Sequence, residues 1–575
     1  MKKAIAIVIV AVSMVLFVAA AMLLFDFVTA GRNNGTQGTS GTTEIVVPET
    51  PNVTDASYFN FTAHTAQNSD KETYTYYTIS AKSAENLPEI LVIPTEYNGC
   101  EVRFIDTKGF AGAKIKKLYL SGGLKSTGEK AFYGCDKLEE IIVYDSKGFF
   151  IGNSAFEWCC GLEKISFYNC ELAQFGNCSF KDCRKLKEFN FFVSTVGIID
   201  KNAFENCTSL KSFCVPKSTA RIDCTAFEGC ENLSVTVDNE NENFYSTGDC
   251  LISKSNKGLV WCKNIDAIPS DGSVTHIEDF TFLEKSGVTE YVMPDFITSI
   301  GSGDINRKSG GFINCQSLEK IVFSKNLKVI PANACIGLKK LQKIDLGSVV
   351  AIKAGAFDDC TSLNIIVWSD KLEELESFNR CPLFTEITIP KGVKSIGSCF
   401  GGCENLTKVT IPDGVEKISG AFNDCPRLRN TVIPEGVKEI TRSFSECDYL
   451  TEITIPSTVN SVLFSFSNCA LLKKAELKNS GRIFSSFQEC TELTEITVPD
   501  GVNVLEYSFW NCTNLRKVTL PGGITVTQSS FSNCPLLMDI YYQGTMAEWA
   551  KINIGWLEGT TAVHCKDGDI KLDGK

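Results

Sequence analysis

The chain has 575 residues, of which 43% are hydrophobic and 22% are charged, enough to bury a large core but too many for one compact globule. Its formal net charge is -12 and it has no basic block, which argues against nucleic-acid binding because phosphate affinity needs clustered Lys and Arg. Only 3 His are present, which leaves little material for histidine-based catalysis or metal sites, whereas 26 Cys and 38 Phe are unusually many.

The first 30 residues are predicted to be a membrane or export signal. Lys2 and Lys3 precede an uncharged apolar stretch from Ala4 to Phe25, and a helix of about 20 apolar residues spans a bilayer. Val28-Thr29-Ala30 also fits the small-residue site at which signal peptidase cuts. Two alternatives follow, an uncleaved transmembrane signal-anchor with a cytoplasmic N-terminus or a secreted chain cleaved near Ala30. Both export the remainder, and we expect a single-pass protein of the cell membrane with its repeat domain extracellular.

The next segments are distinguished by composition. Residues 31–72 are rich in Gly, Thr, Asn and Pro without apolar periodicity, which predicts a flexible tether. A repeat domain is predicted at 73–544, with an insertion at 234–282 where the repeat frame degrades. Residues 545–575 are expected to form a C-terminal cap and an acidic tail.

A Phe-x-x-Cys frame recurs fifteen times along the repeat domain. Fourteen copies have Leu three residues after the Cys, and Phe384 is the exception. The spacing is 23–24 residues in the first five copies and 21–22 residues from Cys360 onward, a period that indicates a stacked repeat architecture. The cysteines of the frame are Cys135, Cys159, Cys183, Cys207, Cys230, Cys315, Cys360, Cys381, Cys403, Cys425, Cys447, Cys469, Cys490, Cys512 and Cys534.

One repeat unit, or rung, predicts its own local structure. The spacing of three between Phe400, Cys403 and Leu406 suits a helical turn, and the alternation of Val409 and Ile411 suits a short strand. A single unit cannot bury its apolar side, whereas stacked units form a continuous core. We therefore expect a β-rich solenoid of roughly 20 rungs with one short strand per rung, and leave open a second short strand on the back.

This pattern resembles the BspA-type leucine-rich repeats of surface proteins from bacteria and some protists. The resemblance covers about Leu87 to Tyr542, and the segments at 91–112 and 540–555 are similar to that family's first and last rungs. The frame departs from the pattern at Cys335, Leu338 and Thr431, which stand in Phe, Cys and Ile positions. The resemblance implies surface interaction, by adhesion to proteins, cells or glycans.

The recurring cysteine has three candidate explanations: disulfides, an array of metal sites, or a ladder of buried thiols. Free Cys behaves as a small buried hydrophobe, and Ala113 and Leu338 occupy the same position in other rungs. Stacked side chains that point the same way have poor geometry for a bridge. We therefore expect a buried structural ladder and no metal or cofactor. If bridges exist, the first pair to consider is Cys250 and Cys262.

The residues beside the first Ile of each strand are predicted to point outward as a candidate interaction face. The alternating charges admit a structural reading, in which each pairs with its opposite on the next strand, and a ligand reading, in which the polar strip docks a protein or glycan. The candidate residues are Lys408, Thr410, Glu452, Thr454, Lys474, Glu476, Glu495, Thr497, Lys517 and Thr519.

These observations favour a binding protein. No nucleophile elbow, zinc-binding helix, phosphate loop or dinucleotide fingerprint is present, so we do not expect an enzyme. We expect a cell-surface leucine-rich repeat protein that mediates adhesion or contacts an extracellular protein or glycan, with no nucleic-acid partner and with the membrane contacted through the N-terminal helix. The alternative is a structural envelope or scaffold protein without a selective ligand.

Overall fold

The computed structural model describes residues 49–263, 268–278, 288–301, 311–312, 315–429, 431–478, 481–527, 529–552 and 561–572. Residues 49–575 form one compact unit. The membrane span expected at 4–25 lies outside the described residues. Within the described ranges, no helix combines the length and the apolar character that crossing a bilayer requires.

The described body is a β-solenoid in which most rungs carry two short strands. The rung that begins at Phe400 has its first strand at Lys408–Thr410 (β31) and its second at Lys417–Ser419 (β32). Val409 and Ile418, the middle residues of these strands, are buried. We call the first strand of each rung the A strand and the second the B strand. The sequence predicted the first strand and left the second open, and the structure shows that the second strand is present.

The A strands of successive rungs pair in parallel, in several sheets. They are β3 (Ile90–Val92), β6 (Lys117–Leu120), β8 (Glu140–Tyr144), β10 (Lys164–Tyr168), β12 (Glu188–Phe192), β14 (Ser212–Val215), β16 (Ser234–Val237), β21 (Glu290–Val292), β23 (Lys320–Val322), β25 (Lys343–Asp345), β27 (Ile365–Val367), β29 (Glu386–Thr388), β31, β34 (Glu452–Ile455), β36 (Lys474–Leu477), β38 (Glu495–Thr497), β40 (Lys517–Pro521) and β42 (Asp539–Gln543).

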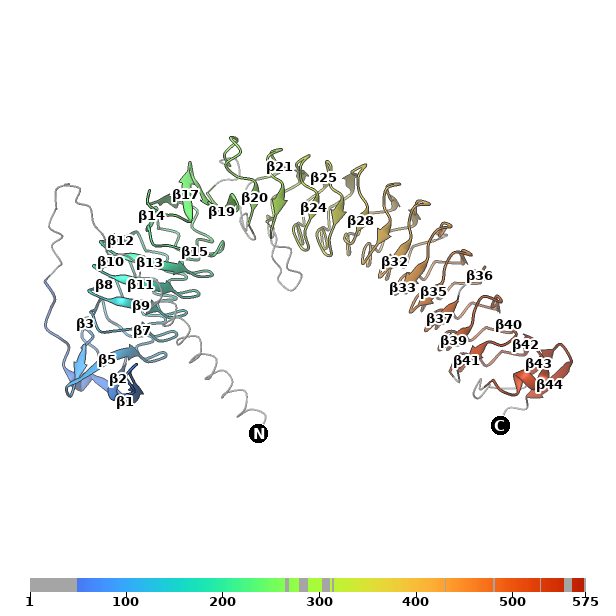
Figure 1. The fold of residues 1–575 in the computed structure, drawn as a ribbon, viewed down its shortest axis with the longest axis horizontal. Coiled ribbons are helices and arrows are strands. Elements are labelled where there is room, and N and C mark those ends of the chain that lie inside the picture. The colour runs from blue at the N-terminus through green and yellow to red at the C-terminus, as the bar shows by residue number, and fades with distance from the viewer. Residues whose placement is uncertain are drawn as a thin grey trace. The chain divides into compact units, whose positions relative to one another are not determined.

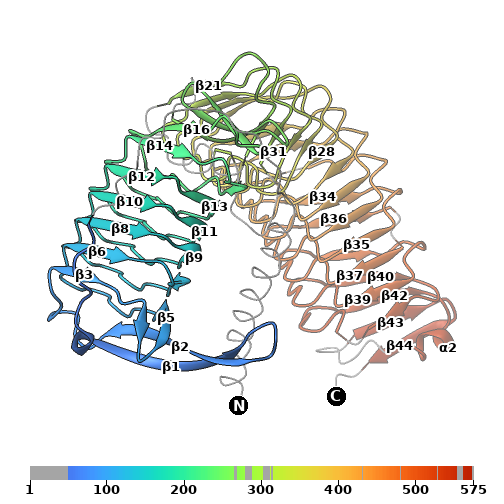
Figure 2. The same cartoon turned by 60° about the vertical axis from the view of Figure 1, so that its left-hand side comes forward.

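The B strands form parallel stacks of their own, and Figure 2 shows β9, β11 and β13 in a column next to β8, β10 and β12. They are β5 (Cys100–Ile105), β7 (Ser126–Thr127), β9 (Lys147–Ile151), β11 (Glu171–Phe175), β13 (Thr195–Ile199), β15 (Arg221–Ile222), β20 (His276–Ile277), β22 (Ser299–Ile300), β24 (Val329–Ile330), β26 (Ala351–Ile352), β28 (Glu374–Leu375), β30 (Ser395–Ile396), β32, β33 (Glu439–Thr441), β35 (Ser461–Leu463), β37 (Arg482–Phe484), β39 (Val504–Glu506) and β41 (Thr525–Val526).

Phenylalanine rings form columns along the inside of the stack, which explains why Phe is so abundant. From Phe357 to Phe531 the frame Phe of each rung stacks on the next, with ring centroids 5.1–5.8 Å apart. A second column runs from Phe110 to Phe227 with centroids 5.1–5.6 Å apart. The columns lie in two large cores, an N-terminal core from Phe59 to Trp261 and a C-terminal core from Cys250 to Val563.

A left-handed residue shapes the turn that precedes each ladder cysteine. In all fourteen rungs in which that residue is described, its φ lies between 53° and 70°. Gly, Asn and Asp occupy most of these positions, because they adopt this conformation at low cost. The other four, Trp158, Arg380, Glu446 and Glu489, adopt it without that advantage.

The ordered body begins earlier than the composition predicts. The range assigned to a tether, 31–72, contains β1 (Phe59–Gln67), which follows a short 3-10 turn (η1, Ala56–Tyr58) and pairs antiparallel with β2 (Thr73–Ala81). Phe59 is buried and packs edge-on against Phe110, so the hairpin covers the first rung. The tether prediction is therefore wrong for this strand, because its alternating aromatic residues lie within a polar composition. A two-residue strand, β4 (Glu96–Tyr97), pairs with β5 beside it.

The insertion also starts later than predicted. Ser234–Val237 form β16, a regular A strand that pairs with β14, and Val235 lies opposite Phe213. In other rungs one residue lies between the frame Leu and the A strand, whereas β16 begins directly after Leu233. This shift by one residue is why the repeat frame was not recognised here. The inserted strands are β17 (Phe244–Thr247), β18 (Cys250–Ser253) and β19 (Gly258–Cys262), which pair antiparallel with one another. Figure 1 shows β19 between β15 and β20.

The C-terminal segment caps the last rung. A four-residue helix, α2 (Met546–Trp549), begins with a capping box between Thr545 and Glu548, and the buried Trp549 packs on Tyr542 with ring centroids 5.4 Å apart. β43 (Thr561–Cys565) pairs with β42, and β44 (Gly568–Leu572) pairs with β43. The part of the predicted acidic tail at 568–572 is therefore a strand of the cap.

Candidate functional site

All fifteen cysteines of the frame are buried, and they have a role beyond filling space. In fourteen rungs the Sγ donates a hydrogen bond, 3.0–3.4 Å long, to the carbonyl oxygen of the frame residue one rung earlier. That residue is Phe except in one rung, where Cys335 occupies the Phe position and accepts from Cys360. The thiol therefore ties each rung to the one before it.

Burial suppresses the acidity of these thiols. It raises the pKa of Cys403 and of Cys469 to about 12, and it raises the pKa of Cys447 well above its ordinary value. The thiolate is the nucleophilic and metal-binding form of cysteine, so a thiol held protonated is chemically inert. Within the described residues, no group of His, Cys, Asp and Glu is arranged to hold a metal ion.

The ten residues of the candidate interaction face lie on A strands β31, β34, β36, β38 and β40; the last four strands belong to one sheet, whereas β31 pairs with β29 and is separated from β34 by the rung of Thr431. Glu452 lies opposite Lys474, and Glu495 lies opposite Lys517. Eight of the ten side chains are exposed, and Thr454 and Thr519 are half-buried. The structure therefore places eight of these residues on one sheet, with Lys408 and Thr410 beyond an interruption, and we call the ten together the strip.

The charges on this strip do not pair as the structural reading expects. Upstream, the Nζ of Lys164 lies 3.8 Å from Glu140 and 3.7 Å from Glu188, as alternating signs predict. Among the described residues, no salt bridge within 4.0 Å joins the charged side chains of the A strands β31, β34, β36, β38 and β40 to one another, whereas Lys417–Glu439 and Arg482–Glu506 are ion pairs between B strands. Lys517 instead lies over the ring of Tyr541, 4.9 Å from its centroid. The downstream strip thus presents charges available to a partner.

The stack of A strands is interrupted next to this strip. β27 closes the sheet of β21, β23 and β25, and β29 begins a separate pair with β31. Within the described part of the chain, no backbone hydrogen bond joins β27 to β29. The B strands of the same rungs, β28 and β30, stay paired. The rungs therefore separate on the A side alone.

Two oversized side chains account for the separation. Trp368 stands where the frame has its second Ile, and Phe384 stands where every other copy of the frame has Leu. Both rings pack edge-on against Phe378, with centroids 5.9 and 6.1 Å away. Since the two aromatic residues lie in adjacent rungs, their added volume accumulates between β27 and β29 and holds the strands apart.

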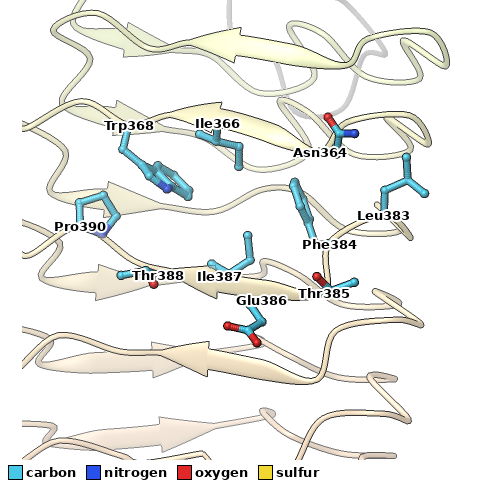
Figure 3. Close-up of a pocket in the computed structure, with 10 residues that line it drawn as sticks. All are labelled: Asn364, Ile366, Trp368, Leu383, Phe384, Thr385, Glu386, Ile387, Thr388 and Pro390. Atoms are coloured by element: carbon cyan, nitrogen blue, oxygen red, sulfur yellow. The ribbon is translucent and has the colours of Figure 1, made fainter.

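The separation forms a cleft of about 440 Å³, and its lining consists of Asn364, Ile366, Trp368, Leu383, Phe384, Thr385, Glu386, Ile387, Thr388 and Pro390. Figure 3 shows Ile366 and Ile387 facing each other across it, with Trp368 near Pro390 and Phe384 toward Leu383. Leu383 on the lining is 47% exposed, and Ile365 and Val367, the outward residues of the adjoining strand β27, are 49% and 40% exposed, so exposed apolar side chains lie at and beside the cleft. This combination marks the cleft as the candidate binding site.

The sequence analysis missed this cleft, although a signal was available. The outward positions of β27 read Ile365 and Val367, where the neighbouring strand has Glu386 and Thr388. The first of these positions is charged in most other rungs, so an apolar pair there indicates a special surface. The A strands are also interrupted after β31, where only an isolated bridge joins Thr410 to Val432. The sequence signals this interruption more clearly, because Thr431 stands in an Ile position of the frame.

A model of the BspA type leucine rich repeat region matches the chain in six copies. The matched residues are 103–234, 275–378, 305–421, 374–485 and 418–538. These segments together span more than half of the chain.

Solved structures are also similar to the chain. A leucine-rich repeat protein from Bacteroides ovatus is 17% identical, with 91% of this chain and 99% of that chain covered and a TM-score of 0.37. A leucine rich cell surface protein from Faecalibacterium prausnitzii is 19% identical, with 88% and 99% covered and a TM-score of 0.24. The pneumococcal vaccine antigen PcpA is 14% identical, with 90% and 99% covered and a TM-score of 0.31. No curated protein matches the chain.

Proposed function

The chain belongs to the BspA-type leucine-rich repeat family, and from this premise we propose that it is a cell-surface protein that binds an extracellular protein ligand through its A strands. The role is binding rather than catalysis. The contact extends from the cleft between β27 and β29 along the polar strip of β31 to β40.

The apolar cleft beside the polar strip is the observation that carries this proposal. Stable interfaces have a desolvated apolar centre surrounded by a polar rim, and a few central side chains supply most of the binding energy. Leu383 on the cleft lining, together with the exposed Ile365 and Val367 beside it, supplies such a centre, and the charges of the strip supply the rim. A protein ligand satisfies both, because it offers apolar side chains together with charged groups.

The cell-surface location rests on the N-terminal sequence. The 22 uncharged residues from Ala4 to Phe25, preceded by Lys2 and Lys3, support export of everything that follows. A membrane-anchored chain displays its repeat domain at the cell surface, whereas cleavage near Ala30 releases it.

The test measures binding of residues 49–575 to a panel of matrix proteins, mucins and glycans by biolayer interferometry. A cleft variant, Ile365→Lys with Val367→Thr, gives β27 the outward residues of other rungs and leaves the core untouched. We expect it to weaken binding of the selected ligand by at least about tenfold, which corresponds to about 1.4 kcal/mol.

Two further variants locate the contact. Reversal of Lys408, Glu452, Lys474 and Glu495 is expected to slow association and to change its salt dependence, as rim charges do. The matched control exchanges Lys417 and Glu439, an ion pair 3.5 Å long between B strands, and should leave binding unchanged. Binding that survives both A-strand variants contradicts the proposal, and an absence of any ligand favours a scaffold role.

A further inference from the structure

The insertion connects the two hydrophobic cores of the solenoid. β18 and β19 are adjacent antiparallel strands, and β19 pairs in parallel with β20, the first B strand after the insertion. One group of their side chains belongs to the N-terminal core and another group to the C-terminal core. The first group is Leu251, Val260 and Trp261, and the second is Cys250, Ile252, Leu259 and Cys262.

Two cysteines of this insertion lie face to face. Cys250 and Cys262 are opposed residues of β18 and β19, and their Sγ atoms are 2.8 Å apart. Both side chains are fully buried. The amide of Lys263 donates to the carbonyl oxygen of Asp249, which places the cysteines at a non-hydrogen-bonded pair. The Cα atoms at such a pair approach to about 4.5 Å, within the range that a disulfide spans.

This geometry differs from that of the ladder. Each ladder thiol points along the stack to a carbonyl oxygen of the preceding rung, as Cys425 does toward Phe400 at 3.0 Å. Cys250 instead points across its hairpin at another sulfur. The opposed pair is therefore set apart from the ladder by the atom that each thiol contacts.

We propose that Cys250 and Cys262 are an oxidative modification site that forms an intramolecular disulfide in the exported protein. A low-molecular-weight disulfide is the oxidant. The thiolate of one cysteine attacks it, which gives a mixed disulfide and releases one small thiolate. The second cysteine, as thiolate, then displaces the other small thiolate. Two protein S–H bonds are lost, one S–S bond forms, and the oxidant takes up both electrons and both protons as two small thiols.

The disulfide fixes the strands that join the two cores. Because both sulfurs are buried, the exchange takes place before the hairpin packs or during its local opening. Once formed, the bond prevents β18 from separating from β19, so the junction opens less often in the oxidised protein. Reduction restores the opening without altering any rung.

The test begins with the wild-type chain incubated with oxidised glutathione, blocked with iodoacetamide in denaturant and digested with trypsin. Cleavage at Lys254 and Lys257 separates the two cysteines, so a disulfide leaves their peptides linked in the mass spectrum. We expect this link and two fewer free thiols than the 26 in the sequence. All thiols remaining free, or links scattered among the ladder cysteines, would overturn the proposal.

A second measurement follows the consequence and does not depend on any ligand. Amide hydrogen exchange in 250–262 is expected to slow at least about tenfold after oxidation and to recover with dithiothreitol. Cys250→Ala with Cys262→Ala should remove this redox response, whereas the ladder pair Cys425→Ala with Cys447→Ala should retain it. Exchange that is indifferent to oxidation in a chain shown to carry the link would refute the role at the junction.

Discussion

The Sγ of Cys425 lies 3.0 Å from the carbonyl oxygen of Phe400 and donates a hydrogen bond to it across two successive rungs. The same relation recurs down the stack, so the cysteine at the repeated phase is both a small apolar side chain and a donor. A valine or leucine fills space without donating, and a serine donates but is more costly to bury.

Replacement of one ladder cysteine should be measurable. Cys425→Ala removes the donor and leaves a small cavity, and we expect the free energy of unfolding to fall by about 1–2 kcal/mol. Urea unfolding followed by circular dichroism measures the change. Cys214→Ala, at an exposed cysteine, is the matched control and should change the value by less than about 0.5 kcal/mol. Equal effects of the two substitutions would contradict a role for the Sγ hydrogen bond.

The ladder also predicts sensitivity to alkali. Burial raises the pKa of Cys403 and of Cys469 to about 12, whereas an unfolded thiol titrates near about 8.5. The folded chain thus keeps protons that the unfolded chain releases. This contribution to stability is complete below about pH 8.5 and is lost as the pH rises toward 12, by about 1.4 kcal/mol per pH unit for each thiol.

Urea midpoints between about pH 7 and 10.5 test this expectation. In Cys469→Ala the urea midpoint should fall less steeply with pH, because one buried thiol no longer contributes. In Cys214→Ala the midpoint should fall as in the wild type. A midpoint that stays constant up to about pH 10 would show that the ladder does not govern alkaline unfolding.

The interruption between β27 and β29 should be repairable. Trp368→Ile with Phe384→Leu restores the frame, and we expect the A strands to close and form the backbone hydrogen bonds seen between β29 and β31. Hydrogen exchange at the amides of Thr385 and Glu386 should then slow by at least about tenfold. Val409→Ile in the next rung, which keeps that strand paired, is the control. Unchanged exchange at these amides would mean that the aromatic side chains are not the cause.

In the C-terminal cap, the pKa of His564 is raised by its two aspartate neighbours. Hydrogen bonds to Asp539, 3.2 Å from Nε2, and to Asp569, 3.0 Å from Nδ1, raise the pKa of His564 above its ordinary value. The raised pKa stabilises the cap fully below about pH 6.5, and this contribution is lost as the pH rises through the folded pKa. Asp569→Asn should lower the midpoint in an NMR titration. Asp567→Asn, which alters the acceptor for the Met546 amide, serves as the control.

The repeat frame predicted the regular part of the fold because its determinants are local. Phe400, Cys403 and Leu406 are buried, as their spacing of three residues predicted. The A strand at Val409 forms where apolar residues alternate with polar ones, as the sequence predicted. The B strand at Ile418 was left open because two or three residues show no periodicity of their own, and pairing with adjacent rungs decides their conformation.

The irregular part escaped prediction because it depends on more than one rung. Trp368 and Phe384 are each acceptable apolar substitutions, and the cleft arises from their combined volume in adjacent rungs. The hydrogen bond from each cysteine was also not predicted, because it joins two rungs. Its acceptor is a backbone carbonyl oxygen, which any residue supplies, so the sequence carries no signal for it. β1 was missed because Phe59 and Phe61 alternate within a polar stretch.

The one-sided interruption at β27 has a mechanical consequence. The B strands form a continuous ten-stranded sheet from β24 to β41, while the A strands are unbonded between β27 and β29. Bending that widens the A side at this rung breaks no backbone hydrogen bond there, whereas bending within a regular sheet must break several. Bending along the stack therefore meets less resistance between β27 and β29 than between bonded A strands, and the cleft is one of the compliant joints of the solenoid.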